Sequence, residues 1–204
     1  TKVTQKGQCD KIFISTTGIG FSAPHTKIGG EQAQPGDIVL LSGTIGDHGI
    51  AVAEARGNLG FQSNVQSDTA PLNGLVSDLL RTVPEVHVLR DPTRGGLATT
   101  LVEIAQQSSV DIALEEAAIP VEATVSKACE LLGLDPLYMA NEGKLLAIVP
   151  PERANLALEV LQKHPYGKNA AVIGKVEGKS RGRLWLKTKL GTTRVLDMLA
   201  GEML

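Results

Sequence analysis

The stretch IVLLSGTIGDHGIAVAEAR, residues 38–56, holds the change of pattern from which the fold is predicted. Ile38 to Ser42 is a short apolar run, which predicts a buried β-strand. The turn Gly43 to Gly49 follows it, and Ile50 to Arg56 has the composition of a helix that ends at Gly57. A strand, a tight turn and a helix in direct succession indicate a domain in which helices pack on a sheet.

Outward from this stretch, strand-like and helix-like segments alternate along the chain. Helices are predicted for residues 72–81, from Asp91-Pro92 through Ile104, from Pro120 to Gly133 and after Pro150-Pro151. Strands are predicted for residues 11–15, 86–89, 112–114, 144–149, 171–176, 184–190 and 193–198. The last three strands follow each other closely, which predicts a hairpin-rich end. The mixture predicts an α+β domain, with a mixed β-sheet and helices packed on it.

Composition narrows the class of protein. The chain has 204 residues, of which 42% are hydrophobic and 21% charged, which is typical of a globular domain. The net charge is −2 without a basic block, and aromatic residues make up 3%, so we expect no nucleic-acid partner. No apolar run approaches the roughly 20 residues that a membrane-spanning helix needs, so we expect no membrane partner.

The two cysteines, Cys9 and Cys129, are too few for a disulfide framework and have no metal-ligand spacing. We expect ordinary reduced thiols, with Cys129 on a core face. The chain opens with polar residues and shows no signal peptide. These features predict a cytoplasmic protein.

The turn between the first strand and helix is the first candidate site. Gly43, Gly46 and Gly49 leave backbone N–H groups uncovered beside the positive end of a helix, which favours an anion. Asp47 and His48 add a titratable pair there. The turn matches neither the phosphate-binding P-loop nor the dinucleotide fingerprint. A simpler interpretation is a tight turn with Asp47 as N-cap, worth about 1 kcal/mol.

The second candidate is Asp91-Pro92-Thr93-Arg94-Gly95-Gly96. Asp91 suits a helix cap and Pro92 a first helical position. Two glycines in a first turn cost about 1 kcal/mol each relative to alanine, so close backbone packing or close approach of a ligand is expected. Arg94 beside them could hold a phosphate with two parallel hydrogen bonds.

The third candidate is Asn141-Glu142-Gly143, directly before the strand KLLAIV. An acidic residue followed by glycine at a strand entry is either a simple turn or a carboxylate held at the rim of a sheet. Elsewhere, we expect His87 to be a core histidine with a satisfied hydrogen bond and Trp185 to be a packing residue. His25 and His164 are expected in loops.

Taken together, the motifs resemble the HypE family of hydrogenase expression/formation proteins. The matching segments are TTGIG (16–20), LSGTIGDHGIAV (41–52), SDTAPLNGLV (67–76), LRDPTRGGLATTL (89–101), ACELLGLDPLYMANEGKLLAIV (128–149), HPYGKNAAVIGKV (164–176) and LDMLAGE (196–202). They cover nearly all of the chain. The wider superfamily includes aminoimidazole ribonucleotide synthetase and selenophosphate synthetase, so the resemblance implies a fold like the C-terminal domain of the former.

The resemblance implies an ATP-dependent dehydration in [NiFe]-hydrogenase maturation. The carbamoyltransferase HypF places a carbamoyl group on a C-terminal cysteine as a thiocarboxamide. ATP, with Mg²⁺, phosphorylates the amide oxygen, a base removes protons from the nitrogen, phosphate leaves, and a thiocyanate remains. The cyano group then passes to iron on the HypC–HypD complex. The resemblance also implies a homodimer when the protein is intact.

The same resemblance suggests roles for the candidate residues, all expected to face one cleft. Glu142 would be the general base or proton relay, supported by Asn141. The nucleotide or phosphate would face Asp91, Thr93, Arg94, Gly95 and Gly96. The substrate tail or a phosphate would lie against Gly46, Asp47, His48 and Gly49. We expect no metal ligand in this chain.

Two departures from the family pattern bear on activity. Family members carry an N-terminal ATP-binding domain before the TTGIG motif, and here only residues 1–25 could belong to its tail and linker, with 26–204 forming the C-terminal domain. Family members also end in Pro-Arg-Ile-Cys, whereas this chain stops at Gly201-Glu202-Met203-Leu204. We therefore expect an engineered or proteolytic fragment that is inactive alone, with most ATP and Mg²⁺ ligands in the other domain.

Two other functions remain open. The chain could be a non-catalytic docking domain for the maturation partners, or part of a small-molecule ATP-dependent synthetase or kinase of the same superfamily. The pairing of Asp-Pro-Thr-Arg-Gly-Gly with Asn-Glu-Gly-Lys-Leu favours the hydrogenase branch.

Overall fold

The computed structural model describes residues 17–21, 27–57 and 60–200. The predicted strand at 11–15, Cys9, His25 and the end of the chain at 201–204 lie outside the described residues. Within the described parts, one sheet contains β1 (Ile38–Leu41), β2 (Val88–Arg90), β3 (Val110–Glu115), β4 (Leu146–Val149), β5 (Ala171–Lys179), β6 (Leu184–Lys187) and β7 (Thr193–Leu196). The α-helices there are α1 (Asp47–Ala55), α2 (Asn73–Thr82), α3 (Gly96–Ser108), α4 (Ala123–Leu132) and α5 (Ala154–Lys163).

The strand order is β2-β4-β1-β5-β3-β6-β7. Neighbouring strands run antiparallel except β3 and β6, which are parallel. The predicted α+β class with a mixed sheet is therefore confirmed. The predicted hairpin-rich end is correct only for β6 and β7, because β5 lies between β1 and β3 instead of pairing with β6.

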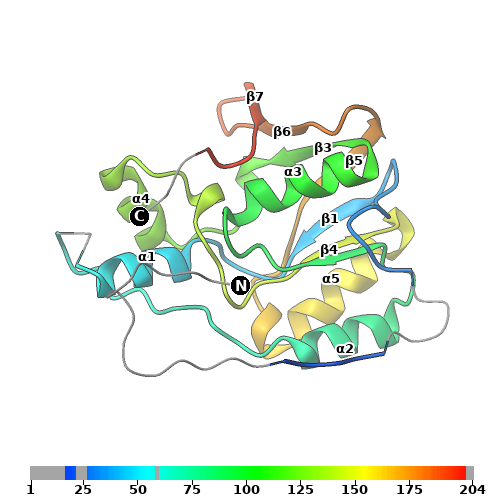
Figure 1. The fold of residues 1–204 in the computed structure, drawn as a ribbon, viewed down its shortest axis with the longest axis horizontal. Helices are drawn as coiled ribbons and strands as arrows, with labels where there is room; N and C mark the ends of the chain where they lie inside the picture. The colour runs from blue at the N-terminus through cyan, green and yellow to red at the C-terminus, as the bar shows by residue number, and fades with distance from the viewer. Residues whose placement is uncertain (1–16, 22–26, 58–59, 201–204) are drawn as a thin grey trace.

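Strand β1 is apolar throughout because both of its faces are covered. Val39 and Leu41 pack in the core beneath α3, whereas Leu40 points to the opposite face and packs with α2 and α5. Alternate side chains of a strand point to opposite faces, so a strand between two helical layers has no place for polar residues. Figure 1 shows α3 on one side of the sheet and α2 beside α5 on the other.

Helices α1 and α4 form a third small core beyond one end of the sheet (Figure 1). Ile50 and Ala53 of α1 pack there against Val125 and Cys129 of α4. Cys129 is buried, as predicted, and burial raises the pKa of its thiol to about 11. Among the helices of the described residues, none has both the length and the apolar character needed to cross a membrane.

Three helix starts differ from the predicted ones. Helix α3 begins at Gly96 rather than at Pro92, because Gly95 and Gly96 have left-handed φ angles of 79° and 64° and the preceding residues form a loop. Helix α1 begins at Asp47, and its N-cap is Gly46 with φ of 86°, so Asp47 is not the cap. Helix α4 begins at Ala123, three residues after Pro120.

Candidate functional site

The buried side chain of Asn141 joins the three predicted motifs. It is 1% exposed and lies just before β4. Its Oδ1 accepts the N–H of Gly46 at 2.9 Å, from the turn between β1 and α1. Its Nδ2 donates to the carbonyl of Pro92 at 2.8 Å, from the loop before α3, and to that of Met139 at 3.1 Å. One amide thus fixes both loops beside Glu142.

Several backbone N–H groups of the turn Gly43–Gly49 donate hydrogen bonds to other parts of the protein. Ile45 donates to the carbonyl of Pro120 at 3.1 Å, and Gly49 donates to that of Ala140 at 3.1 Å. With Gly46 bound to Asn141, two of the three glycine N–H groups predicted to face an anion, those of Gly46 and Gly49, have protein partners. The turn is therefore primarily a packing joint, and its His48 side chain, 22% exposed, lies 4.0 Å from Glu142.

The loop before α3 is tightly packed at Gly96, whereas Asp91 and Arg94 in the same loop are exposed to solvent. A Cβ atom at Gly96 would stand 2.6 Å from the carbonyl oxygens of Leu137 and Met139, so close backbone packing accounts for this glycine. Asp91 and Arg94 are exposed in the same loop. The guanidinium of Arg94 is therefore accessible to a ligand beside the Asn141 contact.

Glu142 lies directly beyond this joint. Its N–H donates to Asp68 Oδ1 at 3.0 Å, which fixes its backbone. Its carboxylate Oε1 is 4.0 Å from His48 Nε2, with the two side chains 29% and 22% exposed. A partly exposed carboxylate on a fixed backbone can accept a proton from a ligand that approaches from solvent.

Beneath Glu142 runs a buried charge network that the sequence did not indicate. The Lys144 ammonium is 2.9 Å from Asp68 Oδ2 and 3.8 Å from Asp47 Oδ2, and Thr44 Oγ1 donates to Asp47 Oδ2 at 2.5 Å. Burial raises the pKa of Asp47, against the opposing effects of the Thr44 hydrogen bond and the Lys144 charge. The network ties the 142–144 segment to both the turn before α1 and the segment at Asp68.

Asp68 and its neighbours were missed because they stand in a polar stretch without secondary structure. The segment Ser67-Asp68-Thr69 follows no glycine turn and precedes α2 by several residues. The one usable signal was its place in the family-like segment 67–76. In the structure, Ser67 Oγ lies 2.9 Å from His48 Nδ1 and 2.8 Å from Thr69 Oγ1.

Other candidate residues lie outside this site. His87 Nδ1 lies 2.8 Å from Asp37 Oδ2, so its predicted hydrogen bond is present, but the side chain is half-buried rather than in the core. Trp185 packs on the sheet with the Arg183 guanidinium 5.6 Å from its ring. His164 accepts the N–H of Tyr166 at 3.2 Å in the turn after α5.

The fold and the match to a family description define the class of protein. Residues 34–187 match the family described as AIR synthase related protein, C-terminal domain, and the chain belongs to this family. Within it, the chain is similar to the carbamoyl dehydratase HypE of Azotobacter vinelandii, with 51% identity over 204 residues. It is also 52% identical to the carbamoyl dehydratase HypE of Cupriavidus necator. The chain is matched in full and spans 60% and 58% of the lengths of these relatives.

The chain is also similar in structure to solved HypE proteins. The crystal structure of hydrogenase maturation protein HypE in complex with ATP has a TM-score of 0.81 and 48% identity, over 85% of this chain and 54% of that one. The structure of a HypE-HypF complex gives a TM-score of 0.80 and 46% identity, over 84% and 56% of the two chains. Thiamine monophosphate kinase from Aquifex aeolicus, at 22% identity and a TM-score of 0.56, shares the fold.

Proposed function

We propose that this chain is the catalytic-base domain of an ATP-dependent carbamoyl dehydratase in [NiFe]-hydrogenase maturation. The observation that carries the proposal is the Asn141 joint, where one amide, next to Glu142 in the chain, binds the turn that leads to His48 and the loop that contains Arg94. The names of the relatives, carbamoyl dehydratase HypE, point to the same reaction.

In the proposed reaction, a C-terminal cysteine thiocarboxamide is activated by phosphorylation of its amide oxygen. One N–H proton is lost as the amide oxygen is phosphorylated, which leaves an imidate phosphate. Glu142 then takes the remaining proton from the nitrogen, the C–O bond breaks as phosphate leaves, and a thiocyanate forms. Arg94 neutralises charge on the departing phosphate, and Asp91 and Thr93 line the same loop. Positioning and charge stabilisation are the main contributions that a protein makes to such phosphoryl chemistry.

The described residues fit a nucleotide only in part. Arg94 offers an exposed guanidinium suited to a phosphate, and a relative was solved with ATP. Asp47 and Asp68, the acidic pair nearest Glu142, are bridged by Lys144, and the described residues form no group of three metal-binding side chains. Mg²⁺ would enter with ATP, and no step proposed here for this chain passes through it.

Partners follow from the same relatives. We propose that the carbamoyltransferase HypF loads the cysteine, in line with the solved HypE-HypF complex. The HypC–HypD complex would receive the cyano group, and the intact protein would be a homodimer.

The test is Glu142→Gln in a full-length protein that contains this chain, loaded with carbamoyl phosphate and HypF. We expect ATP binding to persist and thiocyanate formation to fall by about a hundredfold or more, since a general base contributes on that order. The measurement is the mass of the C-terminal peptide, which loses one water on dehydration. The exposed Glu152→Gln is the matched control. An unchanged thiocyanate yield in Glu142→Gln removes Glu142 from the mechanism.

A second test uses the 204-residue chain alone. We expect neither ATP hydrolysis nor thiocyanate formation at the rate of the full-length protein, because the chain spans only 60% of the length of a relative named carbamoyl dehydratase HypE. If this chain alone hydrolyses ATP at the full-length rate, the expectation that it is inactive alone is wrong.

A further inference from the structure

Three side chains lie in a row between Glu142 and the surface. His48 Nε2 is 4.0 Å from Glu142 Oε1, and His48 Nδ1 is 2.9 Å from Ser67 Oγ. Ser67 Oγ is in turn 2.8 Å from Thr69 Oγ1. Ser67 and Thr69 are both exposed, so the row ends in solvent.

The backbone beneath this row is fixed by Asp68. Its carboxylate accepts the N–H of Glu142 and the ammonium of Lys144 at 3.0 and 2.9 Å. A Cβ atom at Gly143 would stand 1.8 Å from the carbonyl oxygen of Asp68, so the two segments are in direct backbone contact. The hydroxyls on either side of Asp68 are thereby held at a set distance from His48.

An imidazole suits the middle of such a row, because it can take a proton at one ring nitrogen and release one from the other. The 4.0 Å gap between His48 and Glu142 is longer than a hydrogen bond. Catalytic hydrogen bonds are often long before substrate binds and shorten in the substrate complex. The hydroxyls of serine and threonine both donate and accept, so they continue the path.

We propose that His48, Ser67 and Thr69 form the proton exit from Glu142 during dehydration, an inference that rests on the proposed function. The protonated carboxyl of Glu142 gives its proton to His48 Nε2, and His48 Nδ1–H gives one to Ser67 Oγ. The Ser67 hydroxyl proton moves to Thr69, and the Thr69 proton moves to water. One proton enters and one leaves, so Glu142 returns to a carboxylate ready for the next proton.

The charged groups around the row are few. Glu142 faces His48 from the segment before β4, and Asp47 precedes it on α1. Asp68 and Lys144 face each other beneath the row, so their charges compensate.

The experiment is chemical rescue in the full-length protein that contains this chain. We expect His48→Ala to slow thiocyanate formation by about tenfold to a hundredfold at unchanged ATP binding, and added imidazole to restore much of the rate. His48→Gln keeps a polar side chain beside Ser67 but cannot relay, so it is expected to be as slow as His48→Ala. His87→Ala, which removes the other carboxylate-paired histidine, serves as the control and is expected to show no imidazole response.

The outcomes separate the relay from the proposed function. A rate in His48→Gln equal to that of the unaltered protein overturns the relay, and so does a slow His48→Ala that imidazole leaves unchanged at equal folded fraction. If Glu142→Gln also keeps its thiocyanate yield, the role of Glu142 as the catalytic base falls together with the relay. If Glu142→Gln is inactive while His48→Gln is fully active, only the relay falls.

Discussion

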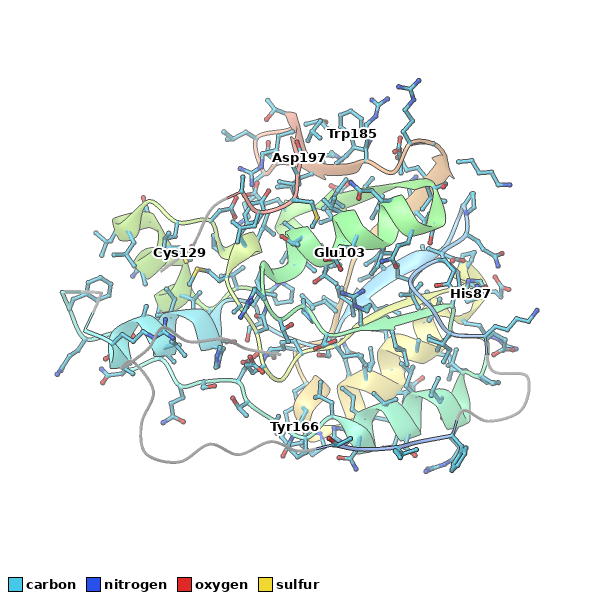
Figure 2. The ribbon with its side chains drawn as sticks, viewed as in Figure 1. His87, Glu103, Cys129, Tyr166, Trp185 and Asp197 are labelled. Carbon is cyan, nitrogen blue, oxygen red and sulfur yellow. The ribbon has the colours of Figure 1, made fainter. Side chains whose placement is uncertain are left out.

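Two histidine–carboxylate pairs in this domain differ in the distance between the partners and in the burial of the carboxylate, whereas the histidine side chains are almost equally exposed, at 21% for His87 and 22% for His48. His87 and Asp37 are 2.8 Å apart, and Asp37 is 4% exposed in its side chain. His48 and Glu142 are 4.0 Å apart, and both side chains are partly open to solvent. Figure 2 shows His87 at the end of the domain opposite Cys129, whose helix α4 packs beside α1 and the His48 pair. We call them the closed pair and the open pair.

The surroundings explain the difference. In the closed pair, Asp37 Oδ2 also accepts the N–H of Gln34 at 2.8 Å, and the backbone N–H of His87 donates to the carbonyl of Ile148. The buried carboxylate of Asp37 thus has two hydrogen-bond partners, as a buried polar group requires. In the open pair, the backbone is fixed while the reactive atoms remain accessible. A histidine beside a carboxylate therefore has a structural role in the closed pair and is a candidate for proton transfer in the open pair.

The largest expected effect on stability comes from Gly143→Ala, which disturbs the backbone contact between Gly143 and the Asp68 segment next to the open pair. The new Cβ would stand 1.8 Å from the Asp68 carbonyl oxygen and 2.9 Å from the Ala70 nitrogen, both backbone atoms that cannot move alone. We expect a loss of about 3 kcal/mol in the free energy of unfolding, measured in urea. Gly178→Ala is the control, since a Cβ there meets nothing within 4 Å. Equal stability of the two variants would contradict the close contact.

The next effect is expected for Asn141→Ala, which releases the joint beside the open pair. The buried N–H of Gly46 loses its acceptor, and Pro92 loses its donor. The expected cost is about 2 kcal/mol in the free energy of unfolding. Dehydration should fall further than the folded fraction does, because the loop with Arg94 is no longer fixed. A variant that loses stability but keeps the full rate per folded molecule would show that the joint does not order the site.

Asp37→Ala removes the carboxylate of the closed pair and tests whether that pair contributes to stability alone. It leaves the Gln34 N–H and the His87 ring without their acceptor, so we expect a loss of about 1 to 2 kcal/mol in unfolding free energy. Asp37→Asn, which keeps an acceptor oxygen, should lose less. The rate of thiocyanate formation per folded molecule should not change. A lower rate in Asp37→Ala at equal folded fraction would mean that the closed pair also acts in catalysis.

The smallest effect is expected for Asp47→Asn, next to the open pair. Burial raises the pKa of Asp47 above its usual 3.8, so the folded state disfavours the charged carboxylate. This group's contribution to stability is therefore lost as pH rises from 3.8 through the raised pKa. Asn removes that dependence, so the variant should gain stability relative to the unaltered chain across this pH window. Urea unfolding at several pH values measures it, and a constant difference would contradict the prediction.

Much of the fold was predictable because local pattern and tertiary packing agree. The apolar run at β1 and the helical pattern of α2 each appear within about two residues of the predicted bounds, as local sequence rules allow. The start of α3 was not predictable in this way. Asp91-Pro92 is a good helix opening by itself, but the Pro92 carbonyl binds Asn141, and two glycines with left-handed φ delay the helix to Gly96.

Some features of the candidate site were visible in the sequence, and others only in the structure. Glycine turns and the Asn-Glu-Gly motif are visible in the sequence, and the structure brings them together at Asn141. The chemical roles of Glu142, Arg94 and the other candidate residues stay predictions. Asp68 and Lys144 could not be paired from sequence, because residues 76 positions apart meet only after the 67–69 segment folds onto the entry of β4.

The sequence by itself determined the alternation of strands and helices and the family resemblance, because hydrophobic periodicity and turn residues act over a few positions. Only the tertiary structure decided which histidine lies beside a buried carboxylate, that of Asp37, and which lies beside a partly exposed one, that of Glu142. That choice depends on burial and on the number of hydrogen-bond partners around each carboxylate, which are properties of distant segments packed together.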